Sequence, residues 1–203
     1  MKKNRNSTLQ EIHRKLILAS SSPRRKELLK QLGLSFRVIP SNIEEKLNPR
    51  HKPSRQAEEL SIQKARAISK KHKDAIIIAA DTLVVIDNEI LGKPIDFREA
   101  KRFLRKLSGR DHNVITGFTI LDMKTSKRVT RSIITKVTMK KLTQSEIDNY
   151  IIQVDPTDKA GGYGIQGIGG VLFEKIDGDY SNILGLPLFH IYQELKKFGI
   201  RIL

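Results

Sequence analysis

The chain has 203 residues, of which 38 are Lys or Arg and 22 are Asp or Glu, so its formal net charge is +16 at pH 7. With 38% hydrophobic residues it can bury enough apolar surface to offset chain entropy, which excludes disorder of the whole chain. The absence of Cys excludes disulfides, thiolate metal sites and a cysteine nucleophile.

Residues 1–15 are basic and polar, and we interpret them as an N-terminal extension before a single domain that spans residues 16–203. The apolar stretch at residues 16–19 is too short for the hydrophobic region of a signal peptide. The longest purely apolar run, residues 75–80, is far below the roughly 18 residues that a membrane-spanning helix needs. We therefore expect a cytoplasmic protein that does not span a membrane.

The first elements are a short buried strand at residues 16–19 and a helix that follows it directly. Ser22 is a suitable N-cap, and Pro23 suits the first helical position. The helix should continue to about residue 32, because Gly33 is a typical residue just beyond a helix end.

A second strand is predicted at residues 36–40, and a longer helix after Pro53. Lys64 lies in the apolar stripe of this helix, where an unpaired ammonium would be costly. It must either extend to the edge of the stripe or meet an anion. The rest of the stripe consists of Ala57, Leu60, Ala65 and Ile68.

Residues 74–87 are too rich in β-branched side chains and too short for an amphipathic helix, so they predict a central strand. Asp81 interrupts this apolar run, and Asp87 and Asn88 suit a hairpin turn at its end. A helix follows at residues 96–107.

The remaining segments complete a mixed α/β domain whose sheet is partly antiparallel and flanked by helices. A capping box at Thr143 and Glu146 begins a helix that should extend to about Val154. The other predicted features are a hairpin of residues 113–123 and 129–138, a glycine-dense stretch at 161–170, a strand at 171–176 and a helix at about 187–198.

The positive charge is unevenly distributed. Residues 142–188 contain two basic and seven acidic side chains, so the excess lies elsewhere and predicts a cationic side that attracts polyanions. A nucleic-acid binder, an enzyme for a phosphorylated small molecule and a merely solvated basic surface all fit this charge. Since aromatic residues make up only 5% and Trp is absent, the chain has little material for stacking single-stranded nucleic acid, and we expect no specific nucleic-acid partner.

Residues 20–25 form the first candidate site. Serines at a strand-to-helix turn offer hydroxyl and backbone N–H groups, and this end of a helix attracts anions. Arg24 and Arg25 are unfavourable for the first turn of a helix unless a counter-anion is bound, and a phosphate suits the guanidinium group. A solvated arginine pair on an ordinary capped helix is the alternative.

Asp81, together with Thr82, forms the second candidate site. A carboxylate on a buried strand can hold a hard cation or a water molecule, and Glu45 could complete such a site for Mg²⁺. Asp81 could instead simply cap a turn. The glycine-dense stretch lacks the residue order of a P-loop and precedes a strand, so neither a Walker nor a Rossmann motif is present.

An ordered set of short motifs extends over nearly all of residues 16–195: Leu18-Ala19-Ser20-x-Ser22-Pro23-Arg24-Arg25, Ile43-Glu44-Glu45, Lys64-Ala65, Ala80-Asp81-Thr82, Gly92-Lys93-Pro94, Leu107-Ser108-Gly109, Thr116-Gly117, Asp158-Lys159-Ala160-Gly161, Gly164-Ile165-Gln166-Gly167, Gly178-Asp179-Tyr180 and Gly185-Leu186-Pro187-Leu188. In this order they resemble the Maf family. Its members are septum-formation inhibitors and nucleoside triphosphate pyrophosphatases, with a fold similar to the inosine triphosphate pyrophosphatases and a cleft between two lobes.

The resemblance implies hydrolysis of a nucleoside triphosphate to the monophosphate and pyrophosphate with a divalent cation, Mg²⁺ or Mn²⁺. Asp81 matches the proton acceptor of the family, and Glu45, Lys64 and Lys93 match its other polar site residues. Asp81 and Glu45 would hold the metal or orient the attacking water, and Ser20, Ser22, Arg24 and Arg25 would bind phosphate. The resemblance also implies a homodimer, a role in clearing non-standard nucleotides and a link to cell-division arrest.

Three positions resemble the family branch that prefers dTTP and UTP: Arg24, Thr82 and Gln166. The Gln166 amide offers both a donor and an acceptor to a pyrimidine edge. Two alternatives stay open, namely a basic nucleic-acid-binding regulator without enzymatic activity and a purine-specific pyrophosphatase of the same fold. Asp155 and the extension at residues 1–15 depart from the family pattern.

Overall fold

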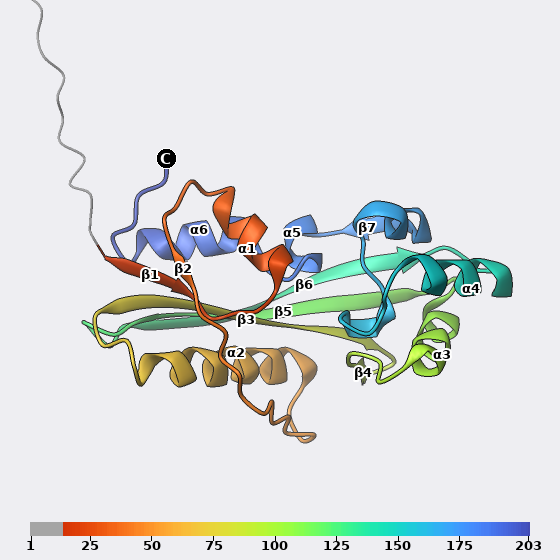
Figure 1. The fold of residues 1–203 in the computed structure, drawn as a ribbon, viewed down its shortest axis with the longest axis horizontal. Coiled ribbons are helices and arrows are strands. Elements are labelled where there is room, and N and C mark those ends of the chain that lie inside the picture. The colour runs from red at the N-terminus through yellow and green to blue at the C-terminus, as the bar shows by residue number, and fades with distance from the viewer. Residues whose placement is uncertain (1–13) are drawn as a thin grey trace, which may run out of the picture.

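The computed structural model describes residues 14–203, which form one mixed sheet flanked by helices (Figure 1). The strand order is β2-β1-β3-β5-β6-β7, with β4 as a second neighbour of β3. Strands β2, β1 and β3 are parallel, and all other pairs are antiparallel. The strands are β1 (Lys15–Leu18), β2 (Arg37–Val38), β3 (Ala75–Ile86), β4 (Glu89–Leu91), β5 (Asp111–Asp122), β6 (Arg128–Met139) and β7 (Phe173–Asp177).

The helices cover the sheet unequally. In Figure 1, α2 alone lies along one face of the long strands, α1 and α6 lie on the opposite face, and α3 and α4 lie at the far end. The helices are α1 (Pro23–Lys30), α2 (Pro53–Ser69), α3 (Phe97–Leu107), α4 (Gln144–Gln153), α5 (Tyr180–Ile183) and α6 (Leu188–Lys196), with 3₁₀ turns at Ala160–Gly162 and Gly167–Leu172.

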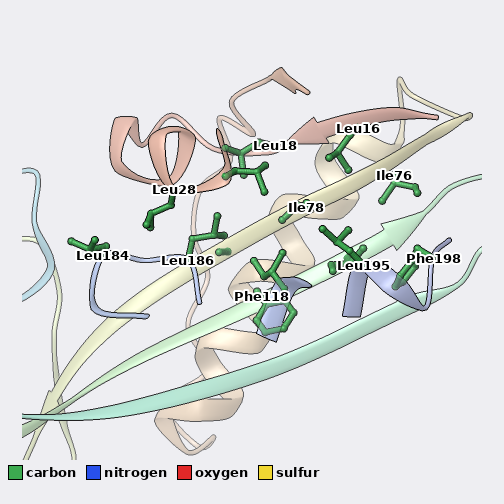
Figure 2. Packing of buried hydrophobic residues seen from close by; sticks show 14 of the residues in the cluster. Leu16, Leu18, Leu28, Ile76, Ile78, Phe118, Leu184, Leu186, Leu195 and Phe198 are labelled. Carbon is green, nitrogen blue, oxygen red and sulfur yellow. The ribbon is translucent and has the colours of Figure 1, made fainter. Parts of the chain in front are cut away.

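Alternation along β3 divides its buried side chains between the two faces, because successive side chains of a strand point to opposite sides. Ile76 and Ile78 belong to a core cluster with Phe118 and the helices α1 and α6 (Figure 2). Ile77 and Ala79 pack on the other face, against Ala65 and Ile68 of α2 in the same cluster. Burial on both faces explains why this segment is an almost continuous apolar run.

The local signals that predict the element boundaries are confirmed. The Ser22 side chain accepts from the Arg25 N–H at 3.4 Å, and Thr143 and Glu146 form both hydrogen bonds of a capping box. Asp87 and Asn88 have φ angles of 51° and 63°, the left-handed conformation that a two-residue hairpin turn requires.

Other boundaries differ from those predicted. β7 begins at Phe173, because Val171 and Leu172 belong to the preceding 3₁₀ turn, and β2 has only two residues. Helix α5 was not predicted; it is one turn long, and the Asp179 side chain caps it by accepting from the N–H groups of Ser181 and Asn182. So short a helix has no periodic apolar pattern that a sequence could show.

The predicted N-terminal extension lies mostly outside the described residues, which begin at Arg14. Its last residue, Lys15, is the first residue of β1, and the Arg14 guanidinium donates to the Asp122 carboxylate next to the turn between β5 and β6. Among the helices of residues 14–203, none is long and apolar enough to cross a membrane.

One edge of β3 is only partly paired with other strands, and the unpaired part of this edge marks the position of the candidate site. Strand β1 pairs with β3 as far as Ile78, and β4 pairs with it from Val84 onward. The edge between them has no strand partner among residues 14–203. The Ile78 carbonyl points toward β1, where it accepts from the Ala19 N–H at 2.8 Å. Every second residue of a strand directs its N–H and C=O groups to the same edge, so those of Ala80 and Thr82 point into the gap between β1 and β4.

Candidate active site

A cavity of about 760 Å³ lies at the gap beside β3. It is lined from both faces of the sheet and by the loops after β1, β2 and β4. The predicted cleft is therefore present. The two predicted lobes correspond to the two ends of one continuous sheet, with α1, α2 and α6 at one end and α3 and α4 at the other (Figure 1). Nine of the ten predicted site residues line it: Ser20, Ser22, Arg24, Arg25, Glu45, Lys64, Asp81, Thr82 and Lys93.

On the α2 side of the sheet, one ammonium group joins two carboxylates. The Lys64 Nζ donates to Asp81 Oδ1 and lies 2.7 Å from Glu45 Oε1. Lys64 and Asp81 are buried, whereas about half of the Glu45 side chain is exposed. The anion expected near Lys64 is therefore present within the chain itself, and both carboxylates converge on one point.

The environment of Asp81 suits a proton acceptor. Burial raises the pKa of its carboxyl above the usual value, and the Lys64 and Arg25 cations oppose this shift. A carboxylate whose pKa is raised toward neutrality accepts a proton more readily from a reacting group beside it.

On the opposite side of the sheet, Arg25 is held in a fixed orientation. Its Nε donates to the Gly185 carbonyl at 2.8 Å, and its NH2 donates to Thr82 Oγ1 at 3.0 Å. Burial lowers the pKa of the Arg25 guanidinium, and the negative charges of Asp81 and Glu45 oppose this shift. An arginine remains charged at any ordinary pH, so the site keeps a partly buried, oriented cation.

A chain of hydroxyl groups supports this arginine. Thr116 Oγ1 donates to the Asn182 carbonyl at 2.9 Å and lies 3.0 Å from Thr82 Oγ1. Because the Thr116 proton is used on that carbonyl, Thr82 must donate to Thr116 while it accepts from Arg25. Asn182 is fully buried and donates to the Val114 carbonyl and to Thr135 Oγ1, both at 3.0 Å.

The other predicted phosphate-binding residues lie around the opening. Arg24 is half-buried and pairs with Asp158 at 3.4 Å, and Lys93 is exposed in the loop after β4. Ser20 is buried, and its Oγ accepts from the Ser22 N–H at 3.1 Å, which shapes the turn before α1. Arg24, Arg25 and Lys93 give part of the cavity lining a positive charge.

Gln166 is the one predicted site residue that does not line the cavity. Its neighbour Ile165 is buried in the core cluster that contains Phe118 and also lines the cavity, whereas Gln166 is exposed. Its role in base selection therefore stays a prediction that rests on the family resemblance. Tyr163 does line the cavity, and its OH is fixed at 2.6 Å from the buried His112 Nε2.

Comparison with known proteins identifies the family. A family model described as Maf-like protein matches residues 15–198. The chain belongs to the Maf family. Three relatives described as dTTP/UTP pyrophosphatase come from Thermoanaerobacter sp. (strain X514), Dictyoglomus thermophilum and Bacillus cereus. They are 50%, 44% and 46% identical to this chain, over 93%, 94% and 93% of it and over 100%, 99% and 98% of their own length.

Two solved structures are more remote from this Maf protein. A nucleoside-triphosphatase / dITP/XTP pyrophosphatase from Mycobacterium abscessus is 14% identical, with a TM-score of 0.41 over 68% of this chain and 94% of that chain. The Staphylococcus aureus Ham1 protein is 12% identical, with a TM-score of 0.45 over 62% of this chain and 72% of that chain. The mixed sheet flanked by helices is seen directly in the structure of this chain.

The carboxylates of this Maf protein suit a divalent cation. Among residues 14–203, no group of three or more His, Asp or Glu side chains could hold a metal ion by itself. Mg²⁺, however, is commonly bound by one or two protein carboxylates together with substrate phosphates and water. Asp81 and Glu45, which converge on Lys64, fit this second arrangement.

Some residues that build the Maf site were not singled out from sequence. Asp158, Asn182 and Gly185 orient Arg24 or Arg25 from the C-terminal half of the chain. Asn182 offered one signal, because it is an amide in a segment that is otherwise suited to burial. Asp158 and Gly185 lie in motifs that resemble those of the family but have no chemical signal of their own.

Proposed function

We propose that this chain hydrolyses dTTP and UTP to the nucleoside monophosphate and pyrophosphate. The observation that carries this proposal is the buried Asp81 carboxylate at a cavity whose other charged groups include Lys64 and Arg25. Its near full-length relatives described as dTTP/UTP pyrophosphatases support the substrate class.

The residues suggest a division of labour. Arg25, Arg24 and Lys93 bind the anionic triphosphate, and their charge stabilises the negative charge that develops on the departing pyrophosphate. Asp81 takes the proton of the attacking water as the bond between the α and β phosphates breaks. Lys64 keeps Asp81 ionised and offers its ammonium group to the substrate.

We also propose that Asp81 and Glu45 hold a divalent cation, Mg²⁺ or Mn²⁺. Such an ion neutralises phosphate charge when it is bound. The support is the convergence of the two carboxylates on one point, together with the family resemblance. The same resemblance supports a homodimer, which light scattering of the eluted protein would test.

Thr82 is the better candidate for substrate selection. It lies in the cavity and is fixed by Arg25 and Thr116, whereas Gln166 lies outside. Apolar side chains beside Thr82, including Val84 and Ile183, line the same cavity and could cover a base.

The test is pyrophosphate release with Mg²⁺ or Mn²⁺ from dTTP, UTP, CTP, 7-methyl-GTP and ITP. We expect release from dTTP and UTP at the highest kcat/KM, with the monophosphate as the second product. Release of orthophosphate instead would contradict the cleavage position. Preference for ITP would favour the purine-specific alternative, and no release from any nucleotide would contradict the enzymatic function.

A further inference from the structure

The loop that carries Glu45 needs a support that the site itself does not supply. Residues 39–52, between β2 and α2, contain no helix or strand, and the Glu45 side chain is about half exposed. A side chain on such a loop is costly to hold in one position, because both backbone and rotamer freedom are lost. Within the site, its contact is the ion pair with Lys64.

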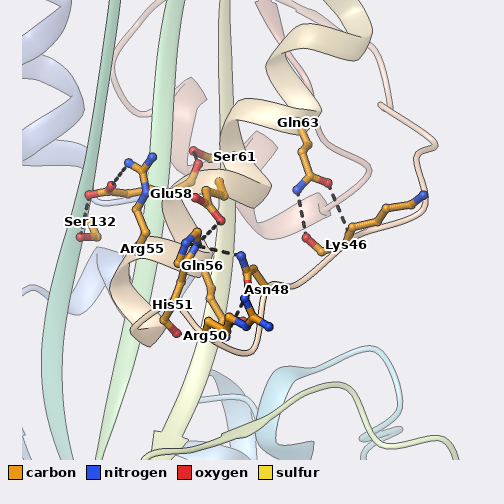
Figure 3. A network of polar contacts seen from close by, with 11 residues as sticks. Lys46, Asn48, Arg50, His51, Arg55, Gln56, Glu58, Ser61, Gln63 and Ser132 are labelled. Atoms are coloured by element: carbon orange, nitrogen blue, oxygen red, sulfur yellow. Dashed lines mark hydrogen bonds and ion pairs between the residues drawn. The ribbon is translucent and has the colours of Figure 1, made fainter.

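We propose that Gln63 of α2 is the positioning residue that holds Glu45 in the active site. The Gln63 amide forms hydrogen bonds to both backbone groups of the next residue, Lys46 (Figure 3). The Lys46 N–H donates to Gln63 Oε1 at 3.3 Å, and Gln63 Nε2 donates to the Lys46 carbonyl at 3.0 Å. Two hydrogen bonds of opposite direction fix both the position and the orientation of this backbone.

Two consecutive residues of α2 thus hold two consecutive residues of the loop. Gln63 binds the Lys46 backbone, and Lys64 binds the Glu45 carboxylate at 2.7 Å. Neither Gln63 nor Lys46 lines the cavity, whereas Glu45 and Lys64 do. Gln63 therefore acts through Glu45 and does not touch the substrate.

The second attachment of the loop is too distant to replace Gln63. It lies at His51, which is labelled beside Gln56 in Figure 3. The His51 carbonyl accepts from Gln56 Nε2 at 2.8 Å, and the His51 Nδ1 lies 2.9 Å from Glu59 Oε2. Residues between Lys46 and His51 are exposed, so this attachment fixes the start of α2 rather than Glu45.

The need for Gln63 increases during turnover, and this step rests on the proposed function. Lys64 is shared between Glu45, Asp81 and the bound triphosphate, so its hold on Glu45 weakens when the substrate engages the ammonium group. The Gln63 amide is uncharged and outside the cavity, so substrate binding leaves its two hydrogen bonds intact. It keeps the Glu45 carboxylate beside Asp81 when catalysis requires it.

The test compares Gln63→Met with Gln153→Met. Methionine keeps the length of the side chain and removes both hydrogen bonds. Gln153 is the matched control, because it is an exposed glutamine at the end of α4 whose amide donates to the Asn149 carbonyl of its own helix. We expect Gln63→Met to lower kcat about tenfold, which corresponds to the loss of about one or two hydrogen bonds, and to change KM for dTTP less than about twofold. Gln153→Met should match the wild type.

A double-variant comparison and hydrogen exchange separate positioning from general damage. In a Glu45→Ala background, Gln63→Met should lower kcat less than about twofold, because the group that it positions is gone. Amide exchange in residues 41–48 should become faster in Gln63→Met but not in Gln153→Met. If Glu45→Ala has no measurable rate, the exchange result and the kcat of the single variant decide.

Three results would overturn the inference: an unchanged kcat in Gln63→Met, an equal loss in the Glu45→Ala background, or unchanged exchange of residues 41–48. An inactive wild type would instead contradict the proposed function, while the exchange experiment would still test the contact between Gln63 and the loop.

Discussion

At the scale of single residues, the site depends on charges that are buried but compensated. Lys64 occupies an apolar stripe and would be costly there by itself, yet two carboxylates surround its ammonium group. Its place in the stripe already indicated that it must meet an anion or extend to the edge. The sequence did not indicate that this anion belongs to the chain, because Glu45 and Asp81 are far apart along it.

His112 shows the opposite solution, a buried titratable group that stays neutral. Burial lowers its pKa from 6.5 to about 4. Below pH 6.5 the unfolded chain binds a proton at this residue while the folded protein does not, so stability falls as the pH falls from 6.5 toward 4. We expect His112 to account for about 2 kcal/mol of lost stability between about pH 7.5 and about pH 5.

Urea unfolding of wild type and His112→Gln at these two pH values checks this prediction. Glutamine can still reach the Tyr163 OH but does not titrate in this range. The pH dependence should be weaker by about 2 kcal/mol in His112→Gln, whereas His72→Gln, which alters a partly exposed histidine, should retain it. Equal pH dependence in all three proteins would contradict this account of His112.

At the scale of elements, the close approach of α2 to β5 places Lys64 beside Asp81. Gly117 pairs with Asp81 across the sheet, and a Cβ atom at Gly117 would fall on the backbone of Ala57 and Glu58. Ser61 makes a second close contact, since its Oγ lies 2.7 Å from Thr119 Oγ1. The absence of a side chain at Gly117 is therefore a condition for the geometry of the site.

Gly117→Ala should push α2 away from the sheet. We expect a loss of about 2–3 kcal/mol in the free energy of unfolding, together with a fall in kcat, because backbone atoms of a packed helix cannot shift cheaply. Ser132→Ala is the control. Ser132 pairs with Gly117 across the sheet and donates to Glu58 Oε1 of α2 at 3.1 Å. The substitution therefore removes a contact with α2 without adding an atom beside the helix. It should cost about 1 kcal/mol or less.

Denaturant unfolding and dTTP turnover of both variants provide the measurement. Unfolding of Gly117→Ala in the absence of denaturant, while Ser132→Ala remains folded, would be a stronger form of the same result. A Gly117→Ala protein with wild-type stability and activity would show that α2 is free to move, and would contradict this account of the helix position.

At the scale of the whole molecule, the site occupies the gap between β1 and β4 along one strand edge. Local patterns predicted most elements: the capping residues, the turn at Asp87 and Asn88, and the apolar run of β3 each depend on neighbouring residues. Motifs and the family resemblance together named ten site residues, of which nine line the cavity. The +16 charge agreed with an anionic ligand but could not select its class.

The parts that sequence could not predict depend on contacts between distant segments. Arg25 and Gly185 are 160 positions apart, and no local pattern relates them. Gln166 is exposed and is not among the residues that line the cavity, although the motif that contains it also contains the buried Ile165. The role of Gln63 could not be predicted, because its amide contacts the backbone of Lys46 and such a contact leaves no pattern in the sequence.

In the reaction that we propose, the buried Asp81 carboxylate accepts a proton during hydrolysis of dTTP. The most direct test measures pyrophosphate release by wild type and Asp81→Asn side by side, with thermal unfolding to show that both are folded. We predict a folded Asp81→Asn protein with kcat lowered about a hundredfold or more, because asparagine keeps the shape of the side chain but cannot take the proton. A folded Asp81→Asn protein with wild-type kcat would contradict the account.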